Sequence, residues 1–178
     1  MILETDRLLI REFRPEDLND VHSYASNPIV VRYMIWGPNT EEETRGFLER
    51  AMEMQRQEPR QDYEMAVIRK EDGRLIGGCG LHISEPRQGE IGYCFHPDYW
   101  GKGYATEAAR ALLAFGFRGL GLHRIYATCR PENTGSAKVM QRIGMTYEGH
   151  IREHMRHKGM WHDSHQYSIL EHEFNDRQ

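Results

Sequence analysis

The chain has 178 residues, 39% of them hydrophobic and 28% charged, which suits a single domain over residues 1–178 with its own hydrophobic core. Its 27 acidic and 23 basic side chains give a formal net charge of −4. This balance argues against a nucleic-acid-binding protein, which needs a basic surface, but it does not repel a cationic amine. No apolar run reaches the length of a membrane span, so no membrane partner is expected.

The 3 cysteines lie far apart and form no CxxC pair, which is typical of reduced intracellular proteins rather than of a disulfide framework. The N-terminus has acids where a signal peptide needs a positive stretch followed by an apolar run. We therefore expect a soluble, cytoplasmic protein.

The first third of the sequence predicts one strand and two helices. The strand is Leu8–Phe13. Pro15 and the acids after it suit the first turn of a helix, which Pro28 ends. Thr40 and Glu43 form a capping box that opens the second helix.

The rest of the chain predicts a mixture of strands and helices that ends in a hairpin. In chain order the segments are Tyr63–Arg69, Leu75–Ile83 and Glu90–His96 as strands, a helix from Tyr104 to Phe117, the strand Ile125–Cys129, a helix from Asn133 to Ile143, and two strands around Lys158-Gly159. This order indicates an α/β or α+β domain built on one sheet.

A glycine-rich loop, Tyr99–Thr106, joins a strand to the most regular helix in the sequence. Small residues at Gly101, Gly103 and Ala105 let bare N–H groups at a helix N-terminus converge on an anion. An ordinary strand-to-helix turn is the alternative interpretation. A P-loop is excluded because the spacing GxxxxGK[ST] is absent, and a dinucleotide loop fits poorly because Thr106 stands where GxGxxG needs glycine.

The same loop resembles the acyl-CoA pyrophosphate loop of the GCN5-related N-acetyltransferases (GNAT), whose pattern is Gln/Arg-x-x-Gly-x-Gly/Ala. Gly103 and Ala105 match this pattern, whereas Trp100 replaces the usual Gln or Arg. That replacement is typical of the branch that resembles ribosomal-protein N-terminal acetyltransferases. Further matches to this branch span roughly residues 4 to 174 and include Thr5-Asp6-Arg7-Leu8, Glu90-Ile91-Gly92-Tyr93, Asn133 with Ser136, and Gly144-Met145.

The resemblance implies the GNAT fold, with a twisted, mixed and mostly antiparallel sheet of about seven strands, flanked by about four helices and splayed between its fourth and fifth strands. It also implies acetyl transfer from acetyl-CoA to a primary amine by direct attack in a ternary complex, without a metal. The implied acetyl-CoA contacts are Tyr93, Cys94, Phe95, Gly101, Lys102, Gly103, Tyr104, Ala105, Thr106 and Asn133.

Two residues are candidates for proton transfer. Glu90 is the candidate general base on the fourth strand, and a solvated carboxylate at a strand end is the competing interpretation. Many relatives protonate the leaving thiolate with a tyrosine at the position of Met140, which carries no proton to give. Ser136 is the substitute that the ribosomal-protein branch suggests, although it can equally be a helix-turn hydroxyl bonded to backbone. Asn133 can hold the pantetheine arm, cap its helix, or do both.

Two further segments leave alternatives open. The pairs His154/His157 and His162/His165 suggest a metal, but i,i+3 spacing on a strand points side chains to opposite faces, so no metal site is expected. The stretch from Tyr33 to Trp36 between the first two helices is either core or a wall of the acceptor pocket.

Three functions remain in competition. The leading one is an N-acetyltransferase that acts on the N-terminal amine of a protein such as a ribosomal protein. The second acetylates a small amine, such as an antibiotic, a polyamine or an amino acid. The third is an acyl-CoA-binding sensor without catalysis, which Met140 favours and the presence of Glu90 and Ser136 disfavours. A homodimer is compatible with each.

Overall fold

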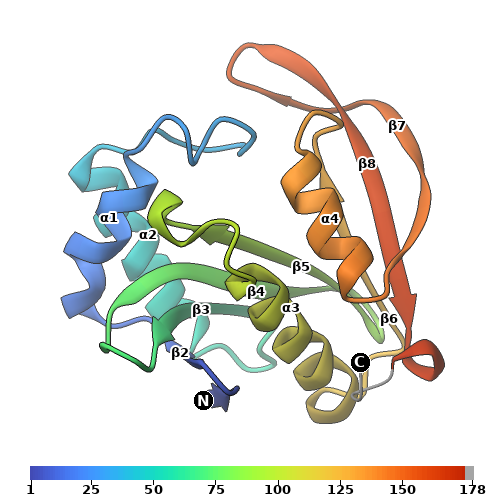
Figure 1. The fold of residues 1–178 in the computed structure, drawn as a ribbon, viewed down its shortest axis with the longest axis horizontal. Helices are drawn as coiled ribbons and strands as arrows, with labels where there is room; N and C mark the ends of the chain where they lie inside the picture. The colour runs from blue at the N-terminus through green and yellow to red at the C-terminus, as the bar shows by residue number, and fades with distance from the viewer. Residues whose placement is uncertain (175–178) are drawn as a thin grey trace.

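The computed structural model describes residues 1–174, in which an eight-stranded sheet is flanked by four α-helices (Figure 1). The strands are β1 Ile2–Glu4, β2 Leu8–Glu12, β3 Asp62–Arg69, β4 Leu75–Glu85, β5 Gln88–Phe95, β6 Arg124–Cys129, β7 Thr146–His157 and β8 Met160–Leu170. The helices are α1 Leu18–Ala25, α2 Glu41–Met54, α3 Tyr104–Ala114 and α4 Thr134–Arg142. Short helical turns are Pro15–Asp17, Pro97–Tyr99, Phe115–Gly119 and Glu171–Glu173. The predicted fold class is confirmed, and the edge strand β1 is the one strand that the sequence analysis missed.

The sheet has the strand order β1-β2-β3-β4-β5-β6-β8-β7, and β5 and β6 are its one parallel pair of neighbours within the described chain. Their pairing covers only Gln88 with Arg124, Gly89 with Ile125, and Glu90 with Tyr126. Beyond Glu90 the two strands separate, as Figure 1 shows between β5 and the elements around β6 and α4. The predicted opening between the fourth and fifth strands therefore lies between β5 and β6.

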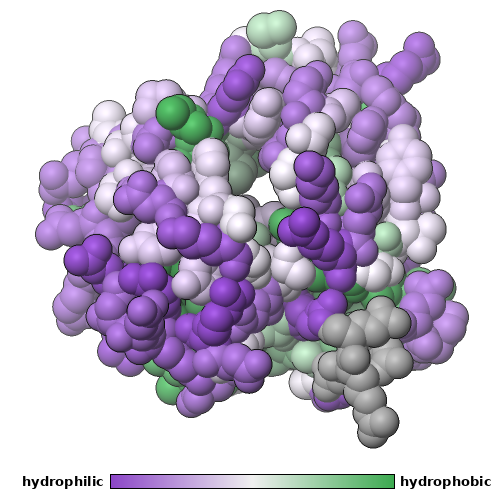
Figure 2. Space-filling model, viewed as in Figure 1, coloured by the Kyte–Doolittle hydropathy of each residue, from purple (hydrophilic) through white to green (hydrophobic). Residues whose placement is uncertain are grey.

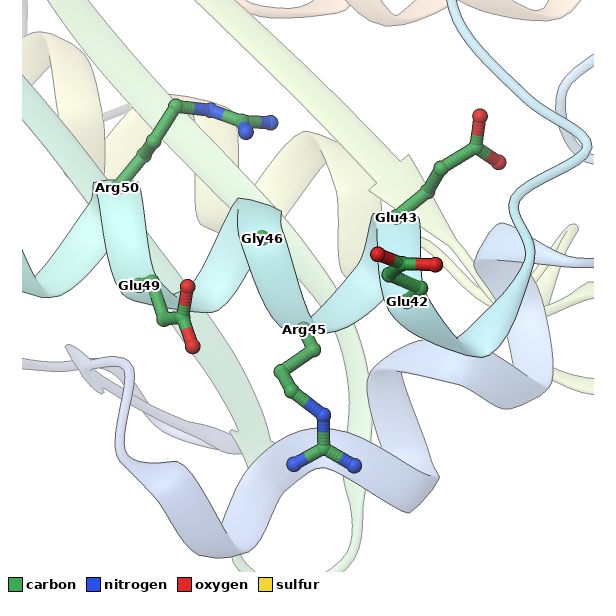
Figure 3. A pocket seen from close by; sticks show the side chains of 6 residues that line it. All are labelled: Glu42, Glu43, Arg45, Gly46, Glu49 and Arg50. Carbon is green, nitrogen blue, oxygen red and sulfur yellow. The ribbon is translucent and has the colours of Figure 1, made fainter.

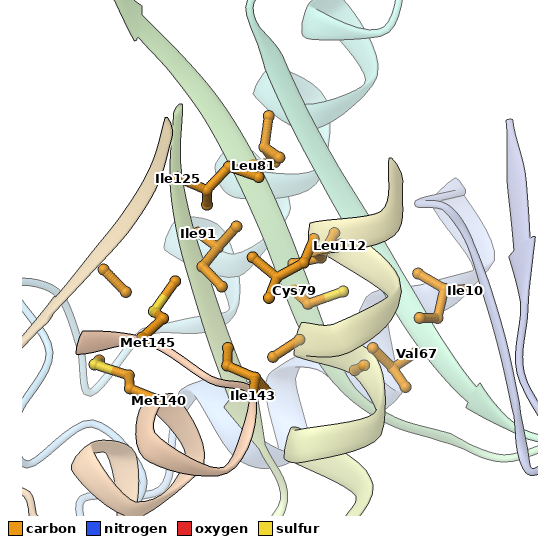
Figure 4. Packing of buried hydrophobic residues seen from close by; sticks show 14 of the residues in the cluster. Ile10, Val67, Cys79, Leu81, Ile91, Leu112, Ile125, Met140, Ile143 and Met145 are labelled. Carbon is orange, nitrogen blue, oxygen red and sulfur yellow. The ribbon is translucent and has the colours of Figure 1, made fainter. Parts of the chain in front are cut away.

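Helices cover both faces of the sheet and bury two apolar clusters. On one face α3 and α4 form the larger cluster, in which Leu112 packs near Cys79 and Ile91 while Met140 and Ile143 close the other end (Figure 4). On the opposite face α1 and α2 pack against β3 and β4. The position of Met140 in this core, with 1% of its surface exposed, explains why an apolar side chain is suitable there.

Local sequence signals fix the helix ends. Thr40 accepts a hydrogen bond from the backbone N–H of Glu43 at 3.2 Å, and the Glu43 carboxylate accepts one from the N–H of Thr40 at 2.7 Å, which confirms the predicted capping box. Asn133 caps α4 by accepting a hydrogen bond from the N–H of Ser136 at 3.2 Å. Gly144 follows α4 with a φ of +89°, the left-handed conformation that terminates helices.

The glycines of β4 differ in what a side chain would meet, which gives a test of the sheet register. A Cβ at Gly77 would collide with the carbonyl of Cys94 and lie 2.9 Å from Cα of Phe95, whereas a Cβ at Gly92 on β5 would meet open space. We expect Gly77→Ala to lower the free energy of unfolding by about 2 kcal/mol relative to Gly92→Ala, measured by chemical denaturation. Equal stability of the two variants would contradict the register of β4 against β5.

Candidate active site

Glu90 stands where β5 and β6 separate. It faces Tyr126 in the last pair of the parallel ladder, and its carboxylate accepts a hydrogen bond from Thr128 Oγ1 at 3.3 Å. The residue is half-buried. Past this point the edge of β5 that faces β6, over residues 91–95, has no strand beside it within residues 1–174. Backbone N–H and C=O groups on such an edge are available to a ligand.

Ser136 and Tyr93 come together on the other face of β5. The hydroxyl of Tyr93 donates to the carbonyl oxygen of Ser136 at 3.1 Å and lies 3.0 Å from Ser136 Oγ. Burial raises the pKa of the Tyr93 hydroxyl well above its ordinary value, although the hydrogen bond with Ser136 acts in the opposite direction. The Tyr93 hydroxyl is therefore neutral at physiological pH. The sequence analysis predicted only Ser136 for proton transfer and missed the Tyr93 hydroxyl.

The glycine loop before α3 has the geometry of an anion site. Gly101 and Gly103 adopt φ values of +73° and +82°, and Gly103 at the N-cap offers no side chain to occupy the first N–H groups of the helix. A Cβ at Gly101 would meet nothing within 4 Å, so the approach to the loop is open. Ala105 and Thr106 lie in the first turn behind it. These features fit the pyrophosphate of acetyl-CoA.

Two side chains of the loop turn back onto the protein. Lys102 Nζ donates to the carbonyl of Asp98 at 2.7 Å. Trp100 Nε1 donates to the carbonyl of Phe95 at 2.8 Å and so ties the loop to the end of β5. This contact gives a structural role to the tryptophan that departs from the GNAT pattern. Tyr104 is buried, and its ring contacts the ring of Tyr99 at the start of the loop.

The N-terminal segment holds the loop from outside, through contacts that the sequence analysis did not foresee. Glu107 accepts hydrogen bonds from Thr5 Oγ1 at 2.6 Å and from Arg7 Nε at 2.7 Å. Arg7 also donates to the carbonyl of Lys102 at 3.0 Å. Burial alone would raise the pKa of Glu107, but the hydrogen bonds from Thr5 and Arg7 outweigh it and hold the pKa below its ordinary value. We call these contacts of Thr5 and Arg7 with Glu107 and Lys102 the clasp. The matched motif Thr5-Asp6-Arg7-Leu8 was the only sequence signal for it.

The connection between α1 and α2 approaches the β7–β8 hairpin across the open face of β5. Lys158 at the hairpin tip donates to the carbonyl of Val31 at 2.8 Å. Between these segments and the sheet the side chains leave a hollow, visible near the centre of Figure 2. Val31 is buried, Tyr33 and Met34 are half-buried, and Trp36 is 37% exposed. The connection therefore contributes both to the core and to the surface beside the hollow.

The histidines of the hairpin do not pair as their spacing suggests. His154 contacts Ser164 Oγ at 2.8 Å, His157 stacks on His162, and His165 lies 3.3 Å from His150. An irregularity in β7 between residues 151 and 155 changes the register that sequence spacing alone implies. In residues 1–174 no three side chains of His, Cys, Asp or Glu gather as a metal-binding group. The lack of a metal in the reaction stays a prediction.

A separate hollow of about 500 Å³ lies along the outer face of α2 (Figure 3). Its lining comes from one helix and consists of Glu42, Glu43, Arg45, Gly46, Glu49 and Arg50. None of these residues belongs to β5, to α4 or to the glycine loop, so this charged surface is not part of the site. No helix in the described part of the chain is both long and apolar enough to cross a membrane.

Comparisons with known proteins identify the family of this chain. The model of the acetyltransferase (GNAT) domain family matches residues 7–146. The uncharacterized N-acetyltransferase YnaD of Bacillus subtilis is 39% identical over 176 residues, which cover 98% of this chain and 100% of that protein. A GNAT-family acetyltransferase from Bacillus anthracis, solved as a crystal structure, is 40% identical and has a TM-score of 0.87, with 97% of this chain and 100% of that chain covered. Spermidine N(1)-acetyltransferase of Escherichia coli is 26% identical over 169 residues, 93% of this chain and 87% of that protein.

Fold, loop and relatives together define an acetyltransferase. The chain belongs to the GNAT family of N-acetyltransferases, whose acetyl donor is acetyl-CoA. The individual contacts with acetyl-CoA and the proton-transfer roles of Glu90 and Ser136 stay predictions.

The loop assignment predicts that backbone shape matters more than the charge at Lys102. Gly103→Val should abolish acetyl-CoA binding in calorimetry, because a branched residue is strained at a φ of +82° and its Cβ would lie 3.3 Å from Arg7 Nη2, so the loop or Arg7 has to shift. Lys102→Ala should weaken binding only modestly. Gly121→Val is the matched control, since Gly121 also has a positive φ, of +64°, and nothing lies within 4 Å of its Cβ position. Unchanged binding by Gly103→Val would overturn the assignment.

Loss of the clasp should weaken acetyl-CoA binding, but less than Gly103→Val does. We expect Arg7→Ala to weaken acetyl-CoA binding about tenfold, or roughly 1.4 kcal/mol, because the loop loses its outer support. Arg45→Ala removes a comparable exposed ion pair, with Glu41 on α2 at 3.1 Å, and should leave affinity unchanged. Since the pKa of Glu107 is lowered, the stability contributed by the clasp is present above about pH 4.3 and is lost as the pH falls through the lowered pKa. Equal affinities of the two arginine variants would show that the clasp does not support the loop.

Proposed function

We propose that this acetyltransferase acts on the N-terminal α-amine of a protein, by direct attack of the amine on acetyl-CoA in a ternary complex. The observation that carries direct attack is the open edge of β5, with Glu90 on one of its faces and the Tyr93–Ser136 hydroxyl pair on the other. The protein acceptor is supported by the motifs Thr5-Asp6-Arg7-Leu8 and Tyr99–Ala105, which resemble those of ribosomal-protein N-terminal acetyltransferases.

The proposed chemistry needs two proton transfers. An ammonium group has no lone pair, so the acceptor first loses one proton, with Glu90 as the proposed base. The amine nitrogen then bonds to the thioester carbon, and a backbone N–H on the free edge of β5 stabilises the charge on the carbonyl oxygen. When the C–S bond breaks, the thiolate takes the second proton of the nitrogen by way of Ser136, with Tyr93 as its hydrogen-bond partner. The sum is one amide, one free thiol and one proton released to solvent.

A small amine is the second candidate acceptor. The similarity to spermidine N(1)-acetyltransferase of Escherichia coli favours it, because that name describes a small polyamine as the acceptor. A catalytically silent acyl-CoA sensor is the third candidate. Cys79, Cys94 and Cys129 are all free thiols, which supports a reducing compartment such as the cytoplasm for any of these roles.

A thiol-release assay with acetyl-CoA and a panel of amines separates the three candidates. The panel contains peptides with Ser, Ala or Met at the N-terminus, the same peptides with a blocked N-terminus, and polyamines, amino acids and aminoglycosides. Release with free but not blocked peptides supports the proposal. Release only with small amines favours the second candidate, and tight acetyl-CoA binding without release favours the sensor.

The two proton-transfer residues predict opposite pH dependences. Glu90→Gln should lower kcat/KM mostly at neutral pH, with a loss that shrinks at high pH as the amine becomes neutral by itself. Ser136→Ala should cost more as the pH rises, since solvent then supplies fewer protons to the thiolate, and acetyl-CoA affinity should stay nearly intact. Losses of about 10²–10⁴-fold are typical of general acids and bases. Wild-type profile shapes in both variants, with losses under about tenfold, would assign positioning rather than proton transfer to these residues.

A further inference from the structure

A second carboxylate, Glu64 on β3, lies on the same face of the sheet as Glu90. Glu64 pairs across the sheet with Gly80 on β4, and Gly80 pairs with Gly92 on β5. Residues opposite one another in a sheet point to the same face, and so do residues two apart along a strand. Glu64, Gly80, Gly92 and Glu90 therefore share the face that lies beneath the α1–α2 connection.

The two glycines leave a clear path from Glu64 to the opening. A Cβ at Gly80 would lie 2.9 Å from Glu64 Oε2, so the carboxylate rests directly on this glycine. A Cβ at Gly92 would meet nothing within 4 Å, so the space over β5 is open. β3 and β5 are two strand spacings apart, roughly 10 Å, so the path from Glu64 to β5 requires a chain of water molecules rather than one. Larger side chains at either position would close this path.

Glu64 also differs from the carboxylates around it in having no partner. In residues 1–174 it accepts no hydrogen bond and forms no ion pair, whereas Glu90 is held by Thr128 and Asp62 is paired with His82. A half-buried carboxylate without a partner is costly to the folded protein. Its position over Gly80, on the face of the sheet that carries Glu90, points to a functional role.

We propose that Glu64 finally takes up the proton that the substrate amine loses. The proton reaches Glu64 through water molecules that lie over Gly80 and Gly92. This inference rests on the proposed acetyl transfer to an amine. The proton leaves the ammonium nitrogen at Glu90, passes along water and neutralises the Glu64 carboxylate. After the amide has formed, Glu64 releases this proton to solvent, so that the balance of one proton per turnover is unchanged.

The electrostatic surroundings suit a group that exchanges a proton near neutral pH. Burial, and next the negative charge of Asp62, raise the pKa of Glu64 to about 7, while His82 opposes the rise. The other titratable groups that interact with Glu64 are Tyr24 from α1 and the thiol of Cys79 on β4. Burial raises the pKa of both, and it raises the pKa of Cys94 on β5 to about 12, so these three groups stay neutral at pH 7. Among Glu64, Tyr24, Cys79 and Cys94, Glu64 is therefore the group that changes charge near pH 7.

The test is the pH dependence of kcat/KM for the best acceptor between pH 5.5 and 9.5. In the wild type we expect the rate to rise with pH to a break near 7, where Glu64 ionises. In Glu64→Gln the break should vanish and kcat/KM should keep rising toward the pKa of the amine, with a loss of about 10²-fold at neutral pH that shrinks above it. In Glu90→Gln the path to Glu64 is cut at its first carrier, so kcat/KM should likewise keep rising above pH 7.

Two matched measurements exclude a purely structural role. Asp62→Asn removes a negative charge that raises the pKa of Glu64, so it should move the break to lower pH without abolishing it. The folded-state pKa of about 7 exceeds the unfolded value of about 4.3, so ionised Glu64 destabilises the protein as the pH rises between these values. Glu64→Gln should therefore melt at the same or a higher temperature than the wild type at pH 8, and it should bind acetyl-CoA normally.

The outcomes distinguish this inference from the function on which it rests. Thiol release by the wild type together with an unchanged profile in Glu64→Gln overturns the role of Glu64 alone. A lower melting temperature of Glu64→Gln at pH 8, with losses that do not depend on pH, also overturns it in favour of a structural role. No thiol release from any amine by the wild type overturns both.

Discussion

The backbone hydrogen bonds that β5 does not make with β6 are the constraint around which the site is arranged. Pairing stops at Glu90 and Tyr126, so the peptide groups of the following residues need water or a ligand to satisfy them. An unsatisfied buried peptide group costs about 1–3 kcal/mol, which makes an extended molecule with amide groups a favourable third partner for this edge. The pantetheine arm of acetyl-CoA is such a molecule. In the predicted complex, the glycine loop at one end of β5 and α4 beside it determine where the donor lies.

The same constraint explains why contacts from several segments of the chain converge on the opening. A sheet that is open along one edge cannot itself hold the loop and helix beside it, so other segments fix them. Trp100 joins the loop to the carbonyl of Phe95, and Arg7 joins it to the start of the chain through Glu107. On the other side of β5, Tyr93 reaches α4 at Ser136. The site is thus positioned by three single side chains rather than by a continuous ladder.

The sequence predicted what depends on neighbours along the chain. The capping box at Thr40, the glycine loop and the order of the main elements each follow from local patterns, and the family resemblance added the opening between strands. What depends on register across strands was not accessible in the same way. Nothing local shows that Glu64 rests on Gly80, and the irregularity in β7 altered which histidines meet. The Tyr93 hydroxyl was missed because its partner lies 43 positions away along the chain.

The contact between Lys158 and the carbonyl of Val31 joins the α1–α2 connection to the β7–β8 hairpin beside the hollow. Together with the sheet, these two segments form a closed rim beside the hollow that Figure 2 shows. Under the proposed function, such a rim sorts acceptors by whether they have a free end. A chain terminus or a small amine threads such a rim directly, whereas a lysine in the middle of a folded loop would have to enter as a doubled strand. Selectivity for amines at chain ends can thus arise from the closed rim, without any contact that reads their sequence.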